Sequence, residues 1–387
     1  MQDISIRTCR FDEQCEALRQ EVREFMAQEL PPRKKGASES GAVLSKGSAR
    51  GVDPEFSRKL GKRGWIGMAW SSQYGGHARS PLERYVLTEE LLAAGAPVGA
   101  HWIADRQYGP LLVRYASENI KNDLLPRIAR GELYICVGMS ESDSGSDLAS
   151  LRTRAERTKG GWLINGRKTW NSASQWSHYM VALVRTGAAG ETRHGGLTQF
   201  LIDLKAPGVS LRPVRILTGE HRWNEVTFDD VFVPDDHLIG EEGKGWAQVT
   251  TELGFERSGP ERYLSSLYLL LEMLDAADPD NPRHAVALGR LVADMTTIRQ
   301  MSIGVAGMLT RGENPGLAAS VVKELGTTFE QQIPEVAHEI FDMDLSALES
   351  PLEEMMSFLV QTAPSFSIRG GTREILRGII ARGLGVR

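Results

Sequence analysis

The chemically promising side chains of this sequence lie in two places that are far apart along the chain. One is a run of small and hydroxyl-bearing residues at 139–147, which reads MSESDSGSD. Such residues let backbone N–H groups come close to an anionic or electron-rich ring. The other is Glu256, followed directly by Arg257, where a carboxylate could abstract a proton. Taken alone, the run is typical of a surface turn and the Glu-Arg pair of a solvated ion pair, so their meaning depends on the elements that hold them.

The composition is that of an ordinary globular protein. The chain has 387 residues, 41% hydrophobic and 25% charged, enough for a large core and two or three subdomains. Its net charge of -5 gives no general attraction to nucleic acid or to an anionic membrane. The three cysteines have no metal-type spacing, and their odd number favours a reducing compartment, the cytoplasm. No apolar run has membrane-spanning length and the N-terminus lacks a secretion signal, so we expect no metal, nucleic-acid or membrane partner.

Helical spacing dominates the first third of the chain. Apolar residues from Cys15 to Met26 recur at helical intervals, and the run ends before Pro31. Residues 33–52 are rich in Lys, Gly and Ser and predict a weakly ordered loop or insertion. Further helices are predicted from about Pro54, at 82–92 and at 120–128.

The spacing changes near residue 134. Asn165-Gly166 predicts a type I′ hairpin turn because both residue types tolerate positive φ. After Trp246 the helical period returns, most clearly at 288–308 and 321–336, and such long apolar faces suit a helical bundle. A bundle without a catalytic role would explain these stripes equally well. Strands are predicted at 134–137, 162–164, 180–184, 200–202 and 226–233.

The run at 139–147 and the later segment NGRKTWNS at 165–172 together resemble the two flavin-binding stretches of the acyl-CoA dehydrogenase family. The resemblance extends over almost the whole chain, from Gly64 to Ile375. It implies an α+β fold, mainly α, of three parts. These are an N-terminal helical domain at 1–132, a middle β-barrel-like domain at 133–240 and a C-terminal four-helix bundle at 241–387.

The resemblance also implies FAD as the cofactor. Ser140 and Ser172 would hydrogen-bond the flavin, and Trp170 would pack against its ring. The family usually has Thr at both serine positions, so the hydroxyl is kept. It usually has Pro at the position of Ser142, so a rigid residue is lost without loss of a hydrogen-bonding group. In full, the implied cofactor-binding positions are Met139, Ser140, Gly145, Ser146, Trp170, Ser172, Thr372 and Glu374.

The same resemblance identifies a candidate base. Most members carry Tyr-Glu-Gly-Thr near the C-terminus and use its Glu to abstract a proton, whereas the matching position here is Gly370. A second branch, with isovaleryl- and long-chain-type enzymes, has the base in an upstream Glu-Arg pair, which matches Glu256 and Arg257. Because the two departures compensate each other, Glu256 is the predicted base. Arg257 resembles the family arginine that contacts CoA, with Ser146 a further contact, although a structural role suits Arg257 equally well.

The reaction implied is the α,β-dehydrogenation of an acyl-CoA thioester to the trans-2-enoyl-CoA. Glu256 would remove the α-proton while the β-hydride passes to flavin N5. An α-proton is too weakly acidic for a carboxylate unless charge on the thioester carbonyl is stabilised, and the family uses a ribityl hydroxyl and a backbone N–H of the C-terminal motif for this. The N–H of Gly370 can still serve, so Gly370 counts among the catalytic positions. An electron-transfer flavoprotein or a similar acceptor would take the electrons.

Two family motifs are missing from this sequence. Most members carry Arg-x-x-Phe-Gly and later Gln-x-x-Gly-Gly-x-Gly, which hold the ADP half of a neighbouring subunit's flavin. The matching regions here, 276–283 and 338–344, contain neither motif. One explanation is a hetero-oligomer with a paralogous subunit, as in the heterotetrameric bacterial enzymes that shorten steroid side chains. The other is a homo-oligomer in which Arg283, Lys323 or Gln331 substitutes.

Other interpretations stay open. Flavin monooxygenases and nitroalkane oxidases share the fold without needing the glutamate, although Glu256 with Arg257 argues against a monooxygenase. The chain could also be a non-catalytic or flavin-supporting subunit of a heteromer, against which the intact flavin positions argue. The acyl group could be bound to a carrier protein instead of CoA. Tyr263 and Leu267 could shape the acyl pocket, but apolar core is the better interpretation for each.

Overall fold

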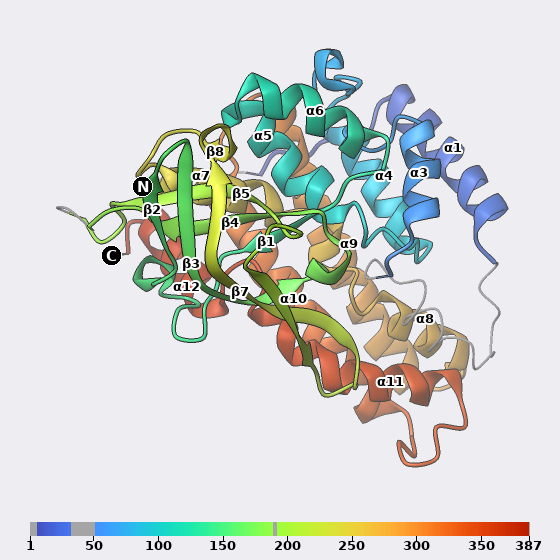
Figure 1. Cartoon of the computed structure of the whole chain (residues 1–387). Coiled ribbons are helices and arrows are strands. Elements are labelled where there is room, and N and C mark those ends of the chain that lie inside the picture. The colour runs from blue at the N-terminus through green and yellow to red at the C-terminus, as the bar shows by residue number, and fades with distance from the viewer. Residues whose placement is uncertain (1–5, 32–50, 189–191, 387) are drawn as a thin grey trace. The chain divides into compact units, whose positions relative to one another are not determined.

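The structure, a computed structural model, describes residues 6–31, 51–188 and 192–386, with the side chains of 251–256 excepted. The stretch predicted to be weakly ordered, 33–52, therefore lies almost entirely outside the described residues. The chain divides into two compact units, each built from separate segments (Figure 1). Unit 1 comprises residues 1–51, 80–97 and 254–387, and unit 2 comprises residues 52–79 and 98–253.

The described residues of unit 1 form helices joined by loops, with no strand among them. Several of its helices begin at a side-chain cap: Asp12 accepts from the N–H of Cys15, and Ser80 and Glu83 form a reciprocal capping box. Proline in the first turn of two further helices costs nothing, because a helix leaves those N–H groups unpaired. The helices are α1 (Glu13–Glu29), α4 (Pro81–Ala93), α8 (Leu267–Ala276), α9 (Pro282–Thr310), α10 (Gly316–Ile340), α11 (Pro351–Thr362) and α12 (Arg373–Gly383).

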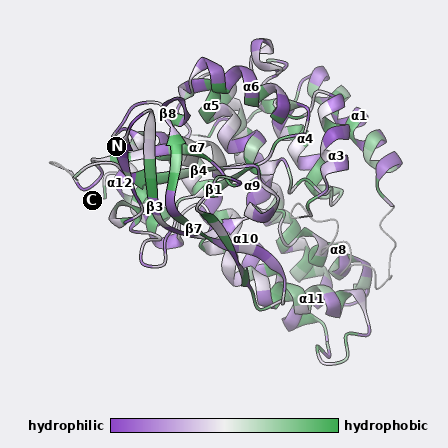
Figure 2. Cartoon of the chain, viewed as in Figure 1, coloured by the Kyte–Doolittle hydropathy of each residue, from purple (hydrophilic) through white to green (hydrophobic). Residues whose placement is uncertain are grey.

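The core of unit 1 lies among its C-terminal helices. One apolar cluster joins α8, α9, α10 and α11, and each of its buried Val, Leu, Ile, Phe and Met side chains contributes about 1.5–3 kcal/mol by burial. A smaller cluster joins α1 and α4 to α9. The helices in Figure 2 alternate purple and green along their ribbons, as amphipathic helices do. Representative members of the larger cluster are Leu270, Leu291, Val322, Phe329 and Met355.

A buried ionic network ties α1, α4 and α9 together. Glu89 receives the Nε and Nη2 groups of Arg299, each at 2.7 Å, and Arg19 donates to it at 3.1 Å. Tyr263 donates to Glu89 at 3.2 Å and shares a hydrogen bond of 2.5 Å with Tyr85. Burial alone would raise the pKa of Glu89, yet Arg299 and Arg19 outweigh burial and lower that pKa. Tyr263 is thus a buried core residue with a polar anchor.

Unit 2 combines short helices with one mixed sheet, drawn in green and yellow in Figure 1. The strand order is β6-β7-β3-β2-β4-β5-β8, and β1 pairs with β4 in parallel. The helices are α3 (Pro54–Lys62), α5 (Gly109–Tyr115), α6 (Glu118–Ala129) and most of α7 (Gly245–Glu256). The strands are β1 (Ile135–Gly138), β2 (Arg154–Thr158), β3 (Gly161–Ser172), β4 (Tyr179–Arg185), β5 (Leu197–Asp203), β6 (Val209–Arg215), β7 (His221–Pro234) and β8 (Leu238–Ile239).

The predicted hairpin turn at Asn165-Gly166 is wrong. Both residues lie inside β3, where the register against β7 shifts between Ile164 and Gly166 and so marks a β-bulge. Gly166 has a φ of +142°, and a Cβ there would stand 2.6 Å from Oγ1 of Thr153. The glycine therefore permits a close approach inside the sheet. The turn itself precedes β3, at Gly160 with a φ of +78°.

The predicted order of helices, then strands, then helices is present. Each predicted strand and each of the long predicted helices has its counterpart, whereas β2, β6 and β8 have none among the predictions. In the described part of the chain, no helix has both the length and the apolarity that crossing a membrane requires.

Candidate active site

The serine-rich run at 139–147 follows β1 directly and forms a tight loop. Glu141 and Ser144 exchange backbone hydrogen bonds of 2.9 and 3.2 Å that close its turn. Gly145 and Ser146 are exposed at the tip, and a Cβ built on Gly145 would meet nothing within 4 Å. The base of the loop is therefore constrained, while its tip is open to a ligand's approach.

Strand β3 holds this loop through neighbouring residues. Lys168 Nζ donates to the carbonyl oxygen of Met139 at 2.9 Å and to Oε1 of Glu141 at 2.8 Å. The N–H of Thr169 donates to the carbonyl oxygen of Ser140 at 2.9 Å. A hydrogen bond that involves a charged group is worth about 1.5–3 kcal/mol. The positions of Met139 and Ser140 are thus set by β3.

The Lys168–Glu141 pair is buried. Lys168 is 0% exposed, and burial lowers the pKa of its ammonium to about 8 against the opposing effect of Glu141. Burial alone would raise the pKa of Glu141, but Lys168 and the N–H groups of Arg152 and Thr153 hold it below its ordinary value. Removing either partner would leave an uncompensated buried charge. The pair is therefore a structural clamp for the loop.

A second bulge in β3 turns Trp170 outward. The register against β7 shifts between Lys168 and Asn171, so both of these side chains are buried, while Trp170, with a φ of +59°, is 57% exposed. Asn171 Nδ2 donates to the carbonyl oxygen of Val137 at 2.8 Å. Its Oδ1 is buried and has no hydrogen-bond partner among the described residues. The bulge thus presents a large aromatic face beside polar groups.

The donor set of this region fits the pyrimidine side of a flavin. The hydroxyls of Ser140 and Ser172 are half-buried, and no described residue of the chain is their hydrogen-bond partner. Hydroxyls and backbone N–H groups suit the carbonyl oxygens and ring nitrogens of a flavin, and the exposed Trp170 offers a stacking surface. Residues of unit 2 therefore offer a set of donors and an aromatic face that fit a flavin ring.

Unit 1 holds the other predicted group. Glu256 is the last residue of α7, and its side chain lies outside the described residues. Arg257 follows it, is 8% exposed, and donates from Nε to the carbonyl oxygen of Gly370 at 3.1 Å. The structure thereby brings the residue after the predicted base to the glycine that occupies the family's other base position.

Gly370 and Gly371 form a left-handed loop, with φ of +66° and +100°. Lys323 of α10 is 0% exposed and donates from Nζ to the carbonyl oxygen of Gly371 at 3.0 Å. A Cβ at position 370 would stand 3.2 Å from both Arg262 Nη2 and Lys323 Cε. A glutamate at position 370 would therefore be strained in its backbone and crowded at its Cβ, which is a physical reason for glycine there.

Thr372 and Glu374 begin α12. Thr372 is the N-cap, and its Oγ1 accepts from the N–H of Ile375 at 3.4 Å. Glu374 lies in the first turn, where its own N–H and the Thr372 hydroxyl hold the pKa of its carboxyl below the ordinary value. Both residues thus have a local role at a helix start, and their cofactor-binding role stays a prediction.

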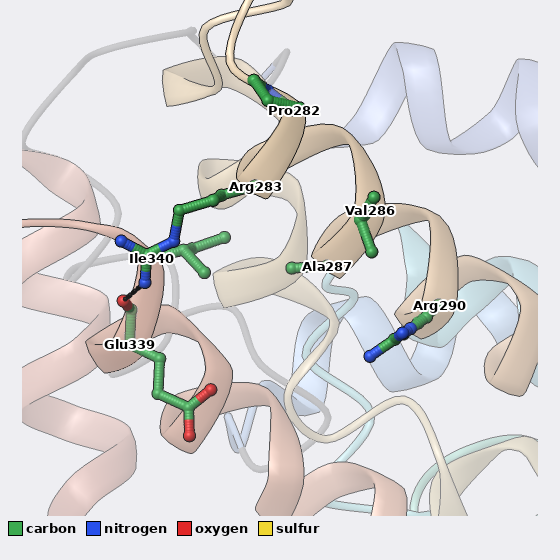
Figure 3. A pocket seen from close by; sticks show the side chains of 7 residues that line it. All are labelled: Pro282, Arg283, Val286, Ala287, Arg290, Glu339 and Ile340. Atoms are coloured by element: carbon green, nitrogen blue, oxygen red, sulfur yellow. Dashed lines mark hydrogen bonds between the residues drawn. The ribbon is translucent and has the colours of Figure 1, made fainter.

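The two regions that lack the family motifs meet within unit 1. The start of α9 and the end of α10 line an open pocket (Figure 3). Its volume is about 390 Å³. Arg283 reaches across it, and its Nη2 donates to the carbonyl oxygen of Glu339 at 3.1 Å. Arg283 and Arg290 of α9 therefore line a pocket beside the two regions that lack the motifs.

Three residues are expected to substitute for those motifs in a homo-oligomer, and two of them are buried or hydrogen-bonded within unit 1. Lys323 is fully buried. Gln331 donates to the carbonyl oxygen of Ala363 at 3.0 Å and accepts from Arg373 at 3.0 Å. Arg283 alone of the three is exposed.

Sequence reasoning missed the residues that position these groups. Lys168 has a weak signal, because it precedes Trp170 in a strand that is otherwise apolar on one face. Lys323 has a clearer signal, since it follows Val321 and Val322 in the apolar stripe of α10, and a lysine in such a stripe needs a buried partner. The partners themselves come from distant segments, and no sequence spacing indicates them.

Three models of one family match the chain. They are the acyl-CoA dehydrogenase N-terminal domain at residues 12–132, the middle domain at 136–231 and the C-terminal domain at 279–385. These matches confirm the predicted fold class, α+β and mainly α, with helical, β and helical parts in that order.

Several known proteins are similar over most of this chain. Acyl-CoA dehydrogenase FadE34 of Mycobacterium tuberculosis is 32% identical over 86% of it, and the match spans 46% of FadE34, about half of that relative. The solved structure of the Tcur3481-Tcur3483 steroid ACAD aligns with a TM-score of 0.84 and 26% identity over 99% of both chains. The ChsE4-ChsE5 complex from Mycobacterium tuberculosis aligns with a TM-score of 0.82 and 28% identity over 98% of this chain and 99% of that one. The expected resemblance to subunits of such complexes is thereby confirmed.

Proposed function

Because this chain belongs to the acyl-CoA dehydrogenase family, we propose that it oxidises an acyl-CoA thioester to the trans-2-enoyl-CoA with FAD as cofactor and Glu256 as base. One contact carries the choice of base. Arg257 donates to the carbonyl oxygen of Gly370 at 3.1 Å. Because Glu256 precedes Arg257 in the chain, we assign its carboxylate to the reaction centre at Gly370.

Proton removal requires that the charge developing on the thioester oxygen be stabilised. The N–H of Gly370 is the donor that we assign to this oxygen. Arg257 and Lys323 engage the carbonyl groups of Gly370 and Gly371, so the loop is arranged before a substrate arrives. A donor that is already in place costs no reorganisation in the transition state.

Bound FAD supplies the acceptor for the hydride that leaves the β-carbon. For this chain's own residues, we assign the pyrimidine edge to the hydroxyls of Ser140 and Ser172 and the ring face to Trp170. Met139 and the tip residue Gly145 contribute backbone that a flavin can approach closely. The Lys168–Glu141 clamp keeps this loop in position.

We assign contact with CoA mainly to Ser146 and secondarily to Arg257. Ser146 is exposed at the loop tip, where a hydroxyl can reach a phosphate or pantetheine oxygen. The Nε of Arg257 is engaged with Gly370 inside unit 1, so holding the glycine loop is its first role and a CoA contact is its second.

The proposal extends to a partner and a substrate class. The neighbouring structures are the Tcur3481-Tcur3483 steroid ACAD and the ChsE4-ChsE5 complex, which supports a hetero-oligomer with a paralogous subunit and an acyl-CoA that carries a steroid. The missing motifs at 276–283 and 338–344 support the same assignment. An electron-transfer flavoprotein or a similar acceptor would take the electrons onward.

The test is to purify the chain alone and together with its neighbouring paralogue, and to measure FAD per chain and mass in solution. Each preparation is then mixed anaerobically with a steroid side-chain acyl-CoA or a straight-chain acyl-CoA while the visible flavin absorbance is followed. We expect stoichiometric FAD and bleaching only for the complex. A loaded complex that no acyl-CoA bleaches would refute the dehydrogenase proposal, and stoichiometric FAD on a homo-oligomer would refute the partner proposal alone.

A further inference from the structure

Lys323 is a fully buried lysine whose ammonium is engaged with a backbone carbonyl. It lies on α10, is 0% exposed, and donates from Nζ to the carbonyl oxygen of Gly371 at 3.0 Å. Taking an ammonium out of water is costly, and a buried charge is often replaceable by an apolar side chain of similar size without loss of stability. Fold stability alone therefore gives little reason for a lysine at this position.

The contact fixes the orientation of a peptide plane. In a trans peptide the C=O and the N–H point in opposite directions, and the described residues contain no cis peptide bond. Lys323 fixes the plane between Gly371 and Thr372, and Arg257 fixes the preceding plane through the carbonyl oxygen of Gly370 at 3.1 Å. Two successive planes of the loop are thus held by two cations.

The residue before the loop is anchored as well. Arg369 Nη2 donates to Oε2 of Glu330 at 2.8 Å and to Oγ of Ser265 at 2.6 Å, and Glu330 is 0% exposed. Gly370 therefore stands between a fixed residue and two fixed peptide planes. Glycines have the greatest backbone freedom of all residues, so a loop of two glycines needs such anchors to direct one N–H group at one point.

We propose that Lys323 is a positioning residue for this reaction: by holding the carbonyl of Gly371 it restrains the C-terminal side of the two-glycine loop, and so limits the directions in which the Gly370 N–H, which belongs to the Arg369–Gly370 peptide, can point toward the thioester oxygen. This inference rests on the proposed function, since it assigns a role within the acyl-CoA dehydrogenation site. Lys323 does not touch the substrate and acts through the glycine loop. A donor displaced by about 1 Å costs on the order of 100-fold in rate, which sets the scale of the expected effect.

The test compares Lys323→Met, Lys323→Arg and Ser320→Ala in the complete purified complex. Met removes the charge and the donor at similar length, and Arg keeps both. Ser320 lies one turn earlier on α10, is 0% exposed, and bonds only the carbonyl oxygen of Gly316 among the described residues, so its truncation is the matched control. The probe is acetoacetyl-CoA, whose enolate absorbs in the ultraviolet and reports how strongly the site stabilises charge on the carbonyl.

We expect Lys323→Met to retain FAD and to bind acetoacetyl-CoA with wild-type affinity. The pH at which the bound ligand becomes the enolate should rise by about one unit, which is a tenfold loss of charge stabilisation, and anaerobic flavin reduction should slow about 10- to 100-fold. Lys323→Arg should recover part of both losses, and Ser320→Ala should change neither.

The possible failures are separable. A wild-type complex that neither enolises the probe nor is reduced by any acyl-CoA refutes the proposed function. A functional wild type with an unchanged enolisation pH in Lys323→Met overturns the role of Lys323 alone. Should Lys323→Met not fold, Lys323→Gln decides: a raised enolisation pH supports the proposal and an unchanged one overturns it.

Discussion

Arg257 donates from its Nε to the carbonyl oxygen of Gly370 at 3.1 Å, although 113 residues separate them. The contact links Gly370 to the residue that follows the predicted base Glu256, and both partners of the contact lie in unit 1. It also gives the C-terminal glycine a second function, because its carbonyl group is a structural anchor while its N–H is a candidate donor.

Glu256→Gln removes the basicity of the predicted base with almost no change in shape. We expect flavin reduction by acyl-CoA to slow by about 100- to 10,000-fold, the range for losing a general base, with FAD content unchanged. Stopped-flow absorbance under anaerobic conditions measures this. Glu242→Gln, at an exposed position before α7, is the matched control and should reduce at the wild-type rate. Equal rates in all three proteins would place the base elsewhere.

Gly370→Ala tests the left-handed loop. An L-residue at a φ of +66° costs about 1–2 kcal/mol, and the added methyl would also press on Lys323 and Arg262. We expect a lower unfolding temperature and slower flavin reduction. Gly289→Ala on α9 is the control: its Cβ meets nothing within 4 Å, so helix propensity should stabilise the protein by about 0.5–1 kcal/mol. Stabilisation by both alanines would contradict the strain argument.

The lowered pKa of Lys168 predicts that the free energy of unfolding increases at high pH. Its pKa in the folded protein is about 8, below its ordinary value of 10.5. Between these values the unfolded chain binds more protons than the folded one, so the contribution of this group to stability increases with pH, by at most about 1.4 kcal/mol per unit. Urea unfolding of wild type and Lys168→Met at about pH 8 and pH 10 gives the difference. The exposed Lys159→Met should follow the wild type, and identical pH slopes for wild type and Lys168→Met would contradict the prediction.

Glu89→Gln tests the network that joins α1, α4 and α9. Removing this charge leaves the guanidinium of Arg299 without its buried partner, and breaking a buried pair costs about 3–5 kcal/mol. Denaturation by guanidinium chloride, monitored by circular dichroism, measures the loss of unfolding free energy. Glu16 also pairs with Arg19 but its side chain is 54% exposed, so Glu16→Gln should cost at most about 1 kcal/mol. Similar losses for both variants would show that burial does not distinguish the two pairs.

The elements that the sequence predicts well are those with strong periodicity. The apolar stripe from Leu288 to Met308 became α9, and the run at 226–233 lies within β7. The strand β6 at 209–215 escaped prediction because it is an edge strand with mostly exposed side chains and contains Pro213, which is tolerated only at an edge. Asn165-Gly166 misled because a glycine that permits close packing in a bulge has the same sequence signature as one in a turn.

The candidate site was predicted in parts. The predicted flavin positions Ser140 and Trp170 rest on a resemblance of sequence, and the structure adds the hydrogen bond from the Thr169 N–H to Ser140 and the β-bulge that exposes Trp170. Lys323 could not be predicted as a partner of Gly371, because their hydrogen bond joins segments 48 residues apart and depends on how α10 and α12 pack. Buried polar partners of this kind are decided by tertiary structure alone.

The way the two units are threaded has a consequence for how the protein is made. Unit 2 ends at residue 253, whereas unit 1 takes its first segments from before that point and its last segment from after it. On the ribosome, α1 and α4 therefore emerge long before α9, the helix they pack against. The apolar faces of α1 and α4 stay without this partner until α9 has been synthesised. All residues of unit 2 have been synthesised before that point. A vectorial order follows, in which the sheet can fold during translation and the helical unit closes only after the final helices have been released.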